Sequence, residues 1–210
     1  MEAFPNRTEA GRLLANELGE YAGRGDVVVL GLPRGGVPVA REVADALDTP
    51  LDVFVVRKLG VPGREELAMG AIASGGIRVR NENVIEALGI PSEDVERVAL
   101  RETDRVAEQE RRFREGRPPL ALANKMVIIV DDGLATGASM RAAVQAVRAA
   151  APTAVIVAVP TASPDAVSGL SAVADRVVAV ITPADFGGVG AWYVDFSQVS
   201  DEEVRHLLRR

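Results

Sequence analysis

Short apolar runs alternate with amphipathic stretches over most of the chain. The runs are uninterrupted, as is typical of central strands in a parallel sheet, and they cover residues 27–31, 125–130, 154–160 and 176–181. Apolar residues at helical spacing lie between them, at 37–47, 138–150 and 164–173. This alternation requires right-handed crossovers. It predicts an α/β fold: an open, mostly parallel twisted sheet of about five strands with helices on both faces.

The other segments predict peripheral elements. We expect a helix at 7–21, a strand at 51–57, a loop at 58–67, extended pieces at 68–73 and 77–80, and helices at 92–115 and 201–208. The long charged helix has a narrow apolar stripe, so we favour a largely solvated helix, and a face buried in a homodimer is the alternative. We expect one domain over residues 1–210, with a core at about 24–182 and a small hood of terminal segments, including 183–210.

The most informative segment follows the apolar run that ends at Val130. Its two acids are followed by a turn into the next helix, and we call this segment the acid loop: Asp131, Asp132, Gly133, Leu134, Ala135, Thr136 and Gly137, with Ala138 and Ser139 opening the helix. Amides at a helix N-terminus carry roughly half a positive charge and bind phosphate. Two carboxylates beside a phosphate repel it unless hydroxyls or a divalent cation lie between them. The segment predicts a ribose 5-phosphate site; helix capping explains two adjacent acids poorly.

A second loop supports this interpretation. Residues 32–36, which we call the glycine loop, follow the strand at 27–31 and contain Arg34, Gly35 and Gly36. The glycines allow close approach to a ligand, and Arg34 offers paired N–H groups to a phosphate. Ligands of such sheets bind beyond the carboxyl ends of the strands, where the strand order reverses. We therefore expect the glycine loop and the acid loop to lie side by side.

The acid loop resembles the signature of the type I phosphoribosyltransferases. Residues 127–139 supply four apolar residues, two acids, two variable residues, a short residue, Thr-Gly, a small residue and Ser. The resemblance covers about residues 27–181. It implies transfer of ribose 5-phosphate from phosphoribosyl pyrophosphate (PRPP) to a small nitrogenous acceptor, with release of pyrophosphate. It also implies Mg²⁺ bridging the pyrophosphate and ribose oxygens.

The resemblance also implies residue roles. Asp131 and Asp132 would hold the ribose hydroxyls, residues 136–139 the 5-phosphate, and the glycine loop the pyrophosphate. Arg57 and Lys58 would neutralise the leaving pyrophosphate, although a solvated strand end is an alternative. The loop at 58–67 would close over the site and exclude water. In the resembled enzymes a non-proline cis peptide precedes the paired glycines, which predicts a cis bond between Pro33 and Arg34.

The acceptor is less constrained. Phe186, Trp192 and Tyr193 follow the last core strand, where the resembled family often stacks its acceptor base, but packing against the C-terminal helix explains the last two equally well. Ala135 replaces the Asp of 6-oxopurine enzymes, which disfavours hypoxanthine and guanine. A non-catalytic protein that senses PRPP or a nucleotide on the same fold is the alternative function.

The composition of the chain excludes several classes of protein and site. The net charge of −6 provides no global attraction for nucleic acid. The chain has no Cys, which excludes disulfides, thiolate metal sites and a Cys nucleophile. No run approaches the ~20 apolar residues of a membrane span, and the first residues do not resemble a signal peptide. We therefore expect a cytoplasmic protein without a membrane or nucleic-acid partner.

Overall fold

The computed structural model describes residues 3–209, without the side chain of Glu66. Its main sheet is parallel, as predicted, and has the strand order β2 (Leu51–Val53), β1 (Val27–Gly31), β6 (Met126–Val130), β7 (Ala154–Thr161) and β8 (Arg176–Ile181). After β1 the chain adds β2 on one side of it, and the later strands β6, β7 and β8 follow one another on the other side. The order therefore reverses between β1 and β6, where sheets of this kind bind ligands.

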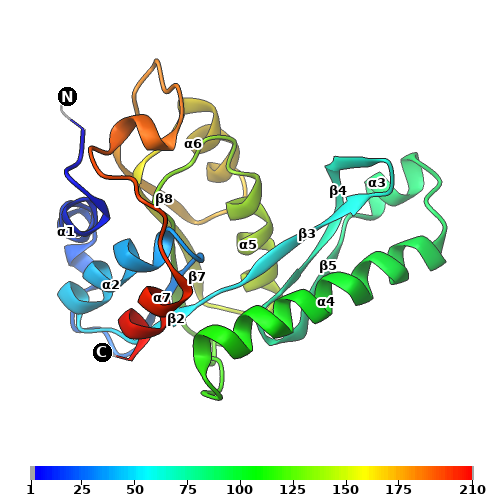
Figure 1. The fold of residues 1–210 in the computed structure, drawn as a ribbon, viewed down its shortest axis with the longest axis horizontal. Helices are drawn as coiled ribbons and strands as arrows, with labels where there is room; N and C mark the ends of the chain where they lie inside the picture. The colour runs from blue at the N-terminus through cyan, green and yellow to red at the C-terminus, as the bar shows by residue number, and fades with distance from the viewer. Residues whose placement is uncertain (1–2, 210) are drawn as a thin grey trace.

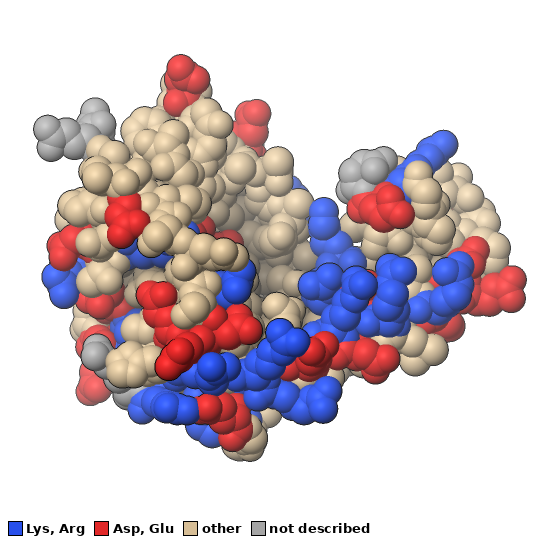
Figure 2. Space-filling model, viewed as in Figure 1, with Lys and Arg blue, Asp and Glu red and all other residues tan. Residues whose placement is uncertain are grey.

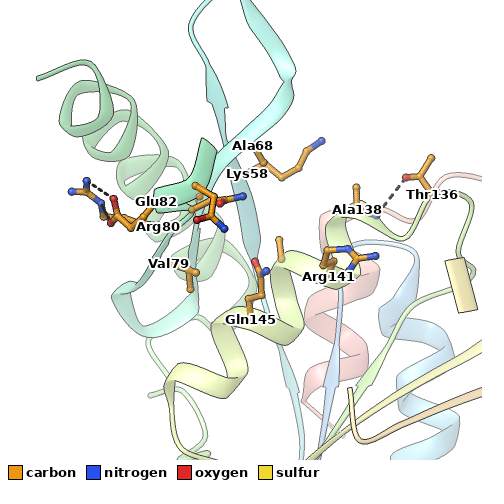
Figure 3. Close-up of a pocket in the computed structure, with 13 residues that line it drawn as sticks. Lys58, Ala68, Val79, Arg80, Glu82, Thr136, Ala138, Arg141 and Gln145 are labelled. Carbon is orange, nitrogen blue, oxygen red and sulfur yellow. Dashed lines mark hydrogen bonds and ion pairs between the residues drawn. The ribbon is translucent and has the colours of Figure 1, made fainter. Parts of the chain in front are cut away.

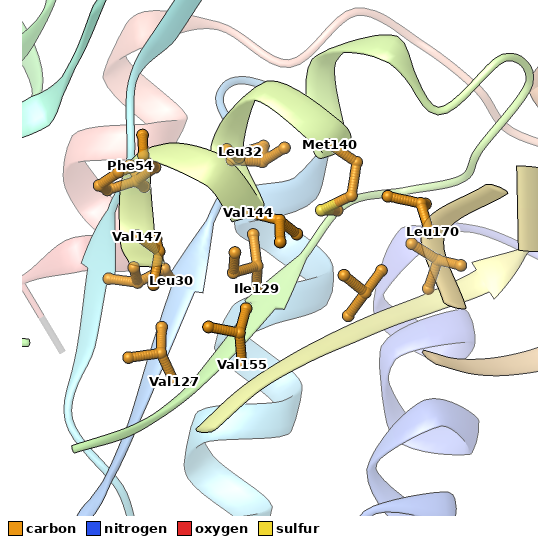
Figure 4. Packing of buried hydrophobic residues seen from close by; sticks show 14 of the residues in the cluster. Leu30, Leu32, Phe54, Val127, Ile129, Met140, Val144, Val147, Val155 and Leu170 are labelled. Carbon is orange, nitrogen blue, oxygen red and sulfur yellow. The ribbon is translucent and has the colours of Figure 1, made fainter. Parts of the chain in front are cut away.

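Helices cover both faces of this sheet (Figure 1). On one face lie α1 (Arg7–Glu17), which a short 3-10 turn (Gly19–Tyr21) follows, and α2 (Gly36–Leu47); on the other lie α5 (Ala138–Ala149) and α6 (Pro164–Ser171). Because successive strand residues point to opposite faces, Leu30 and Ile129 pack against α5 and α6 (Figure 4). Val29 and Ile128 pack against α1 and α2. The fully apolar strands follow from this double coverage.

A second sheet projects from the core (Figure 1). It is antiparallel, in the order β3 (Val56–Val61), β4 (Arg64–Ala73) and β5 (Ile77–Arg80), with a 3-10 turn (Ser74–Gly76) before β5. Two helices complete this region, α3 (Glu82–Ala87) and α4 (Ser92–Arg114). We call residues 56–114 the arm. The sequence pattern did not predict a separate sheet here.

Two predictions were wrong in the arm. The strand expected at 51–57 ends at Val53, and the loop expected at 58–67 is a β-hairpin. Ser74 explains the break, because its hydroxyl accepts from Val55 N at 2.9 Å and its N–H donates to Val55 O at 2.9 Å, which pulls the chain into the second sheet. Leu59 and Met69 then bury one face of the hairpin.

The long helix α4 buries its apolar stripe within the chain. Val98 and Phe113 pack with residues of β3, β4 and the C-terminal helix α7 (Asp201–Leu208). Arg114 fixes the C-terminal end of α4. Its Nε lies 3.1 Å from the buried Asp52 carboxylate, and its Nη2 donates to Val53 O at 2.8 Å. The stripe therefore has a partner without a second subunit, and a homodimer stays a prediction.

The terminal segments meet beside the core. Phe4 N donates to Trp192 O, and Val194 N donates to Phe4 O, both at 2.8 Å. The segment 182–200 is otherwise irregular, apart from a short 3-10 turn (Val189–Trp192). Among residues 3–209, no helix combines the length and the apolar character that a membrane crossing needs.

Candidate functional site

The glycine loop and the acid loop touch at the carboxyl ends of β1 and β6. Gly31 lies opposite Val130 in the parallel register, and Leu32 N donates to Val130 O at 2.9 Å. A Cβ at Gly36 would lie 2.6 Å from Val130 O, and one at Gly35 would overlap the Asp132 carboxylate. The two loops therefore lie side by side, as expected, and both glycines are required for this approach.

The side chain of Arg34 extends from the glycine loop toward α7. The Pro33–Arg34 peptide is cis, as predicted. The Arg34 guanidinium lies 3.5 Å from Asp201 Oδ1, and its side chain is 38% exposed. Arg34 thus keeps part of its guanidinium accessible beside the loop.

The two acids of the site have unusual electrostatics. Burial raises the pKa of Asp131 well above its ordinary value, and the charge of Asp132 raises it further. Burial also raises the pKa of Asp132, although Arg7 opposes this shift. Asp131 Oδ1 accepts from Asp132 N at 2.9 Å, which orients the first carboxylate. The pair therefore places two carboxylates in a site that disfavours their charge.

Residues from both ends of the chain hold Asp132. Arg7 Nε donates to Asp132 Oδ2 at 2.8 Å, and its guanidinium lies 4.1 Å from the centre of the Phe196 ring. The Tyr193 hydroxyl donates to Asp132 O at 2.6 Å. Arg7 was not predicted as a site residue, because 125 positions separate it from Asp132 and no local motif marks it.

The predicted acceptor residues do not form one open platform. Tyr193 is only 6% exposed, and its ring lies 5.6 Å from that of Phe4 and 5.1 Å from that of Phe196, between centroids. Trp192 Nε1 donates to Phe186 O at 2.9 Å, and both of these side chains are half-buried. Tyr193 therefore supports the acid loop, and its ring is covered by protein.

The turn before α5 is tied to the end of β7. Leu134 N donates to Thr161 O at 2.9 Å, and the Ser163 hydroxyl donates to Ala135 O at 2.7 Å. Gly137 has a φ of +70°, a conformation that favours glycine, immediately before α5 begins at Ala138. The first amides of α5 thus lie at a fixed turn, where an anion is stabilised.

Two adjoining cavities connect these elements with the arm. One, of about 200 Å³, is lined by Pro33, Arg57, Asp131 and Ser139 among others. The next, of about 320 Å³, is lined by Arg57, Ser139 and the arm residues Lys58, Arg101 and Glu102. Arg57 and Ser139 line both. Of the predicted site residues in the two loops and the arm, Asp131, Arg57, Lys58 and Ser139 therefore line these two cavities. The others do not: Arg34, Gly35, Gly36, Asp132, Gly133, Ala135, Thr136, Gly137 and Ala138.

Glu102 organises the arm side of the site. Its side chain is 5% exposed, and it accepts from Arg57 Nε at 2.6 Å, from Arg101 Nε at 3.0 Å and from Arg105 at 2.9 Å. Burial alone would raise the pKa of Glu102, but the hydrogen bonds and charges of these arginines outweigh it and lower the pKa. Figure 2 shows Lys and Arg side chains gathered along the arm beside the hollow. Sequence reasoning missed Glu102, since acids and arginines alternate along all of α4.

The acid pair suits a Mg²⁺ ion that arrives with a phosphorylated ligand. Within residues 3–209 no cluster of three or more His, Cys, Asp or Glu side chains could hold a metal alone. Asp131 Oδ1 accepts from an amide and Asp132 Oδ2 from Arg7, which leaves one carboxylate oxygen on each residue. Mg²⁺ typically takes one or two carboxylates and fills its other positions with water and phosphate oxygens. The donor set therefore fits Mg²⁺ bound together with PRPP.

Comparisons with known proteins agree with this geometry. A family model for the phosphoribosyl transferase domain matches residues 2–195. Two Mycobacterium tuberculosis proteins, from strains CDC 1551 and H37Rv and named as phosphoribosyl transferases, are each 49% identical over 213 residues. Each alignment covers 100% of this chain and 47% of the relative, so the chain spans about half the length of these curated relatives.

A solved structure is similar over its whole length. The crystal structure of TT1426 from Thermus thermophilus has 47% sequence identity and a TM-score of 0.91, covering 99% of this chain and 98% of that chain. The family match, the parallel sheet and the paired loops confirm the resemblance seen in the sequence. The chain belongs to the phosphoribosyl transferase family.

Proposed function

We propose that this chain transfers the 5-phosphoribosyl group of PRPP to a small nitrogenous acceptor and releases pyrophosphate. The observation that carries the proposal is the cavity of about 200 Å³ that Asp131, Pro33, Arg57 and Ser139 line together. It joins the Asp131 carboxylate, the glycine loop, a cation and the start of α5. These are the four kinds of group that the parts of PRPP require.

The acid pair acts on the ribose. The free carboxylate oxygens of Asp131 and Asp132 accept hydrogen bonds from the vicinal hydroxyls. They also stabilise the positive charge that develops on the ring as the bond between the anomeric carbon and pyrophosphate breaks. Arg7 and Tyr193 position Asp132 from behind, through its Oδ2 and its backbone carbonyl. This support keeps one carboxylate in place while the sugar moves.

The 5-phosphate binds at the start of α5. Backbone amides of residues 136–139 and the hydroxyls of Thr136 and Ser139 donate to its oxygens. Gly137 makes this possible, because it enters the helix at positive φ and presents no side chain to the anion. The phosphate thus anchors the sugar above the acid pair.

The pyrophosphate binds between the glycine loop and the arm. Arg34, Gly35 and Gly36 hold it from the core, and Arg57 and Lys58 hold it from β3. The free carboxylate oxygens of Asp131 and Asp132 would hold Mg²⁺ together with PRPP, and the ion would offset the negative charge of the pyrophosphate as it leaves. The hairpin of β3 and β4 would exclude water from the reacting carbon only after a movement of the arm, because its tip residues Val61, Pro62 and Arg64 here line a separate cavity with Leu88 and Asp94.

The acceptor approaches from the side of residues 183–193. Phe186 and Trp192 are the half-buried aromatic residues there, and Tyr193 contributes by holding the acid loop. Ala135 provides no carboxylate for a purine N–H, so we propose that hypoxanthine and guanine are poor acceptors.

The test of this function is release of pyrophosphate. Wild-type protein and the D131N/D132N variant are incubated with PRPP, Mg²⁺ and a panel of nucleobases and amines, and pyrophosphate is measured over time. We expect one acceptor class to stimulate release by the wild type and not by the variant. PRPP binding without release for any acceptor would instead support a non-catalytic sensor.

A further inference from the structure

A large polar cleft separates the arm from α5. It measures about 540 Å³, and Figure 3 shows it between β3, β5 and the beginning of α5. We define the polar cleft by the side chains that matter here: Lys58, Arg80, Asn81, Asn83, Arg141 and Gln145. This volume falls in the range of pockets that hold whole small-molecule ligands. It is larger than the two cavities of the proposed catalytic site together.

Two cations of the polar cleft have no partner among the described residues. Within residues 3–209, the side chain of every Lys and Arg makes a hydrogen bond or ion pair except Lys58, Arg64 and Arg141. Lys58 extends from β3 toward the beginning of α5, where Arg141 lies (Figure 3). Unpaired cations that face one cavity stabilise an anion placed between them.

The position of Arg141 depends on a helical glycine. A Cβ on Gly169 of α6 would lie 2.6 Å from a terminal nitrogen of Arg141. Gly inside a helix costs about 0.5–1 kcal/mol relative to Ala. The glycine therefore leaves room for the guanidinium against α6, next to the cleft.

Carboxamides cover the opposite wall. Asn81 Oδ1 caps α3 by accepting from Val84 N at 3.4 Å, which leaves its two N–H donors available. Asn83 and Gln145 are exposed, and Gln145 points into the cleft in Figure 3. Carboxamides offer both donors and acceptors, which matches the edge of a nucleobase.

The polar cleft lies beyond the reacting sugar. Thr136 and Ala138 line its edge, so it reaches the outer side of the 5-phosphate turn. Neither Asp131 nor Asp132 lines it. A ligand in the cleft is therefore near the 5-phosphate and away from the anomeric carbon where the acceptor reacts.

We propose that the polar cleft binds a nucleoside phosphate as a second ligand, separate from both PRPP and the acceptor. Arg141 holds its phosphate, and the carboxamides of Asn81, Asn83 and Gln145 hydrogen-bond its base; Lys58 borders both cavities and stays with the pyrophosphate of PRPP. The cleft adjoins the turn at Thr136 and Ala138, so this ligand and the 5-phosphate of PRPP bind next to each other. Binding at the polar cleft does not require catalysis at the acid loop.

Calorimetry tests this site independently of activity. Nucleoside 5′-mono- and diphosphates of the common bases, and inorganic phosphate alone, are titrated into the wild type, R141Q and R64Q. Arg64 is the matched control, because it is also unpaired but lies at the hairpin, outside the cleft. Thermal unfolding of R141Q confirms that the variant is folded. The wild-type titration is repeated with saturating ribose 5-phosphate.

We expect one nucleotide to bind more tightly than inorganic phosphate, with affinity lowered about tenfold or more in R141Q, the loss of one charge-assisted contact, and unchanged in R64Q. Ribose 5-phosphate should leave nucleotide binding in place. The proposal is overturned if no nucleotide binds better than phosphate, or if R141Q and R64Q behave alike. Displacement of the nucleotide by ribose 5-phosphate would also overturn it, because both would then occupy the 5-phosphate site.

Discussion

The acid loop and the arm carry opposite imbalances of charge across one cavity. At the acid loop, two carboxylates share one cation, since Arg7 bonds Asp132 at 2.8 Å and has no ion pair with Asp131. At the arm, three guanidiniums share the buried Glu102, at 2.6, 3.0 and 2.9 Å. In the proposed function PRPP would balance both sides, because its hydroxyls and developing positive charge suit the acids and its pyrophosphate suits the arginines.

The pKa of a buried carboxyl group is therefore shifted in opposite directions in the two regions. Burial raises the pKa of Asp131, and no cation compensates fully. Glu102 is also buried, but its arginines outweigh burial and lower its pKa. Partner number, more than burial, decides the direction. An acid pair left undercompensated costs stability without ligand, which is characteristic of functional sites.

We expect the largest effect from a variant that removes both carboxylates of the acid loop. In D131N/D132N, the ribose loses two charge-assisted hydrogen bonds of about 1.5–3 kcal/mol each, so PRPP affinity should fall by roughly 10² to 10⁴. Calorimetry with Mg²⁺ measures this loss. Pyrophosphate alone should bind the variant as it binds the wild type, since the arm is intact. Equal PRPP affinity of the two proteins would reject the role of the acids.

We expect the next largest effect from a substitution that removes one cation from the arm. Arg57→Gln should lower the affinity for pyrophosphate by about tenfold, because one charge-assisted contact is lost. Arg97→Gln is the control, since Arg97 lies on the same helix as Arg101 and Arg105 but pairs with Asp94 instead of Glu102. If both variants weaken pyrophosphate binding equally, general surface charge explains the effect and the Glu102 cluster does not.

A smaller effect concerns the single cation of the acid loop. Arg7 lowers the pKa of Asp132 by hydrogen bond and charge, so Arg7→Gln should raise that pKa further. Fewer carboxylates are then ionised at a given pH, and the pH profile of PRPP binding should move to higher pH, with little change at its plateau. A profile that stays in place would show that Arg7 supports the loop without controlling its charge.

The smallest effect is on stability without ligand. The folded chain binds the Asp131 proton more tightly than the unfolded chain, so this residue lowers wild-type stability as the pH rises from the ordinary Asp range through its raised pKa. Asp131→Asn removes this titration. The variant should melt a few degrees above the wild type at neutral pH, and the difference should vanish in acid. A lower melting temperature at neutral pH would contradict the assignment.

The sequence predicted the parts of the site that are contiguous. The acid loop, the glycine loop and their adjacency follow from two strands and two turns, each written in about a dozen neighbouring residues. The cis peptide at Pro33 came from the family resemblance. Arg7 could not be found this way, because Asp132 lies 125 positions away, and Glu102 could not, because Arg57, which links it to the site, lies 45 positions away.

The arm was mispredicted for a related reason. Residues 58–67 contain two glycines, a proline and charged side chains, which is typical of a loop. The hairpin exists because β4 supplies a partner strand and α4 covers its apolar face. Tertiary packing, which local propensity does not report, decided its structure.

We expect the two oppositely unbalanced regions to bind one molecule of PRPP. The most direct measurement is calorimetric titration of PRPP into the wild-type chain with Mg²⁺, compared with ribose 5-phosphate and pyrophosphate titrated separately. We predict one site per chain and an affinity for PRPP well above that for either fragment, because only PRPP engages both regions. PRPP binding that is no tighter than that of pyrophosphate alone would contradict the account.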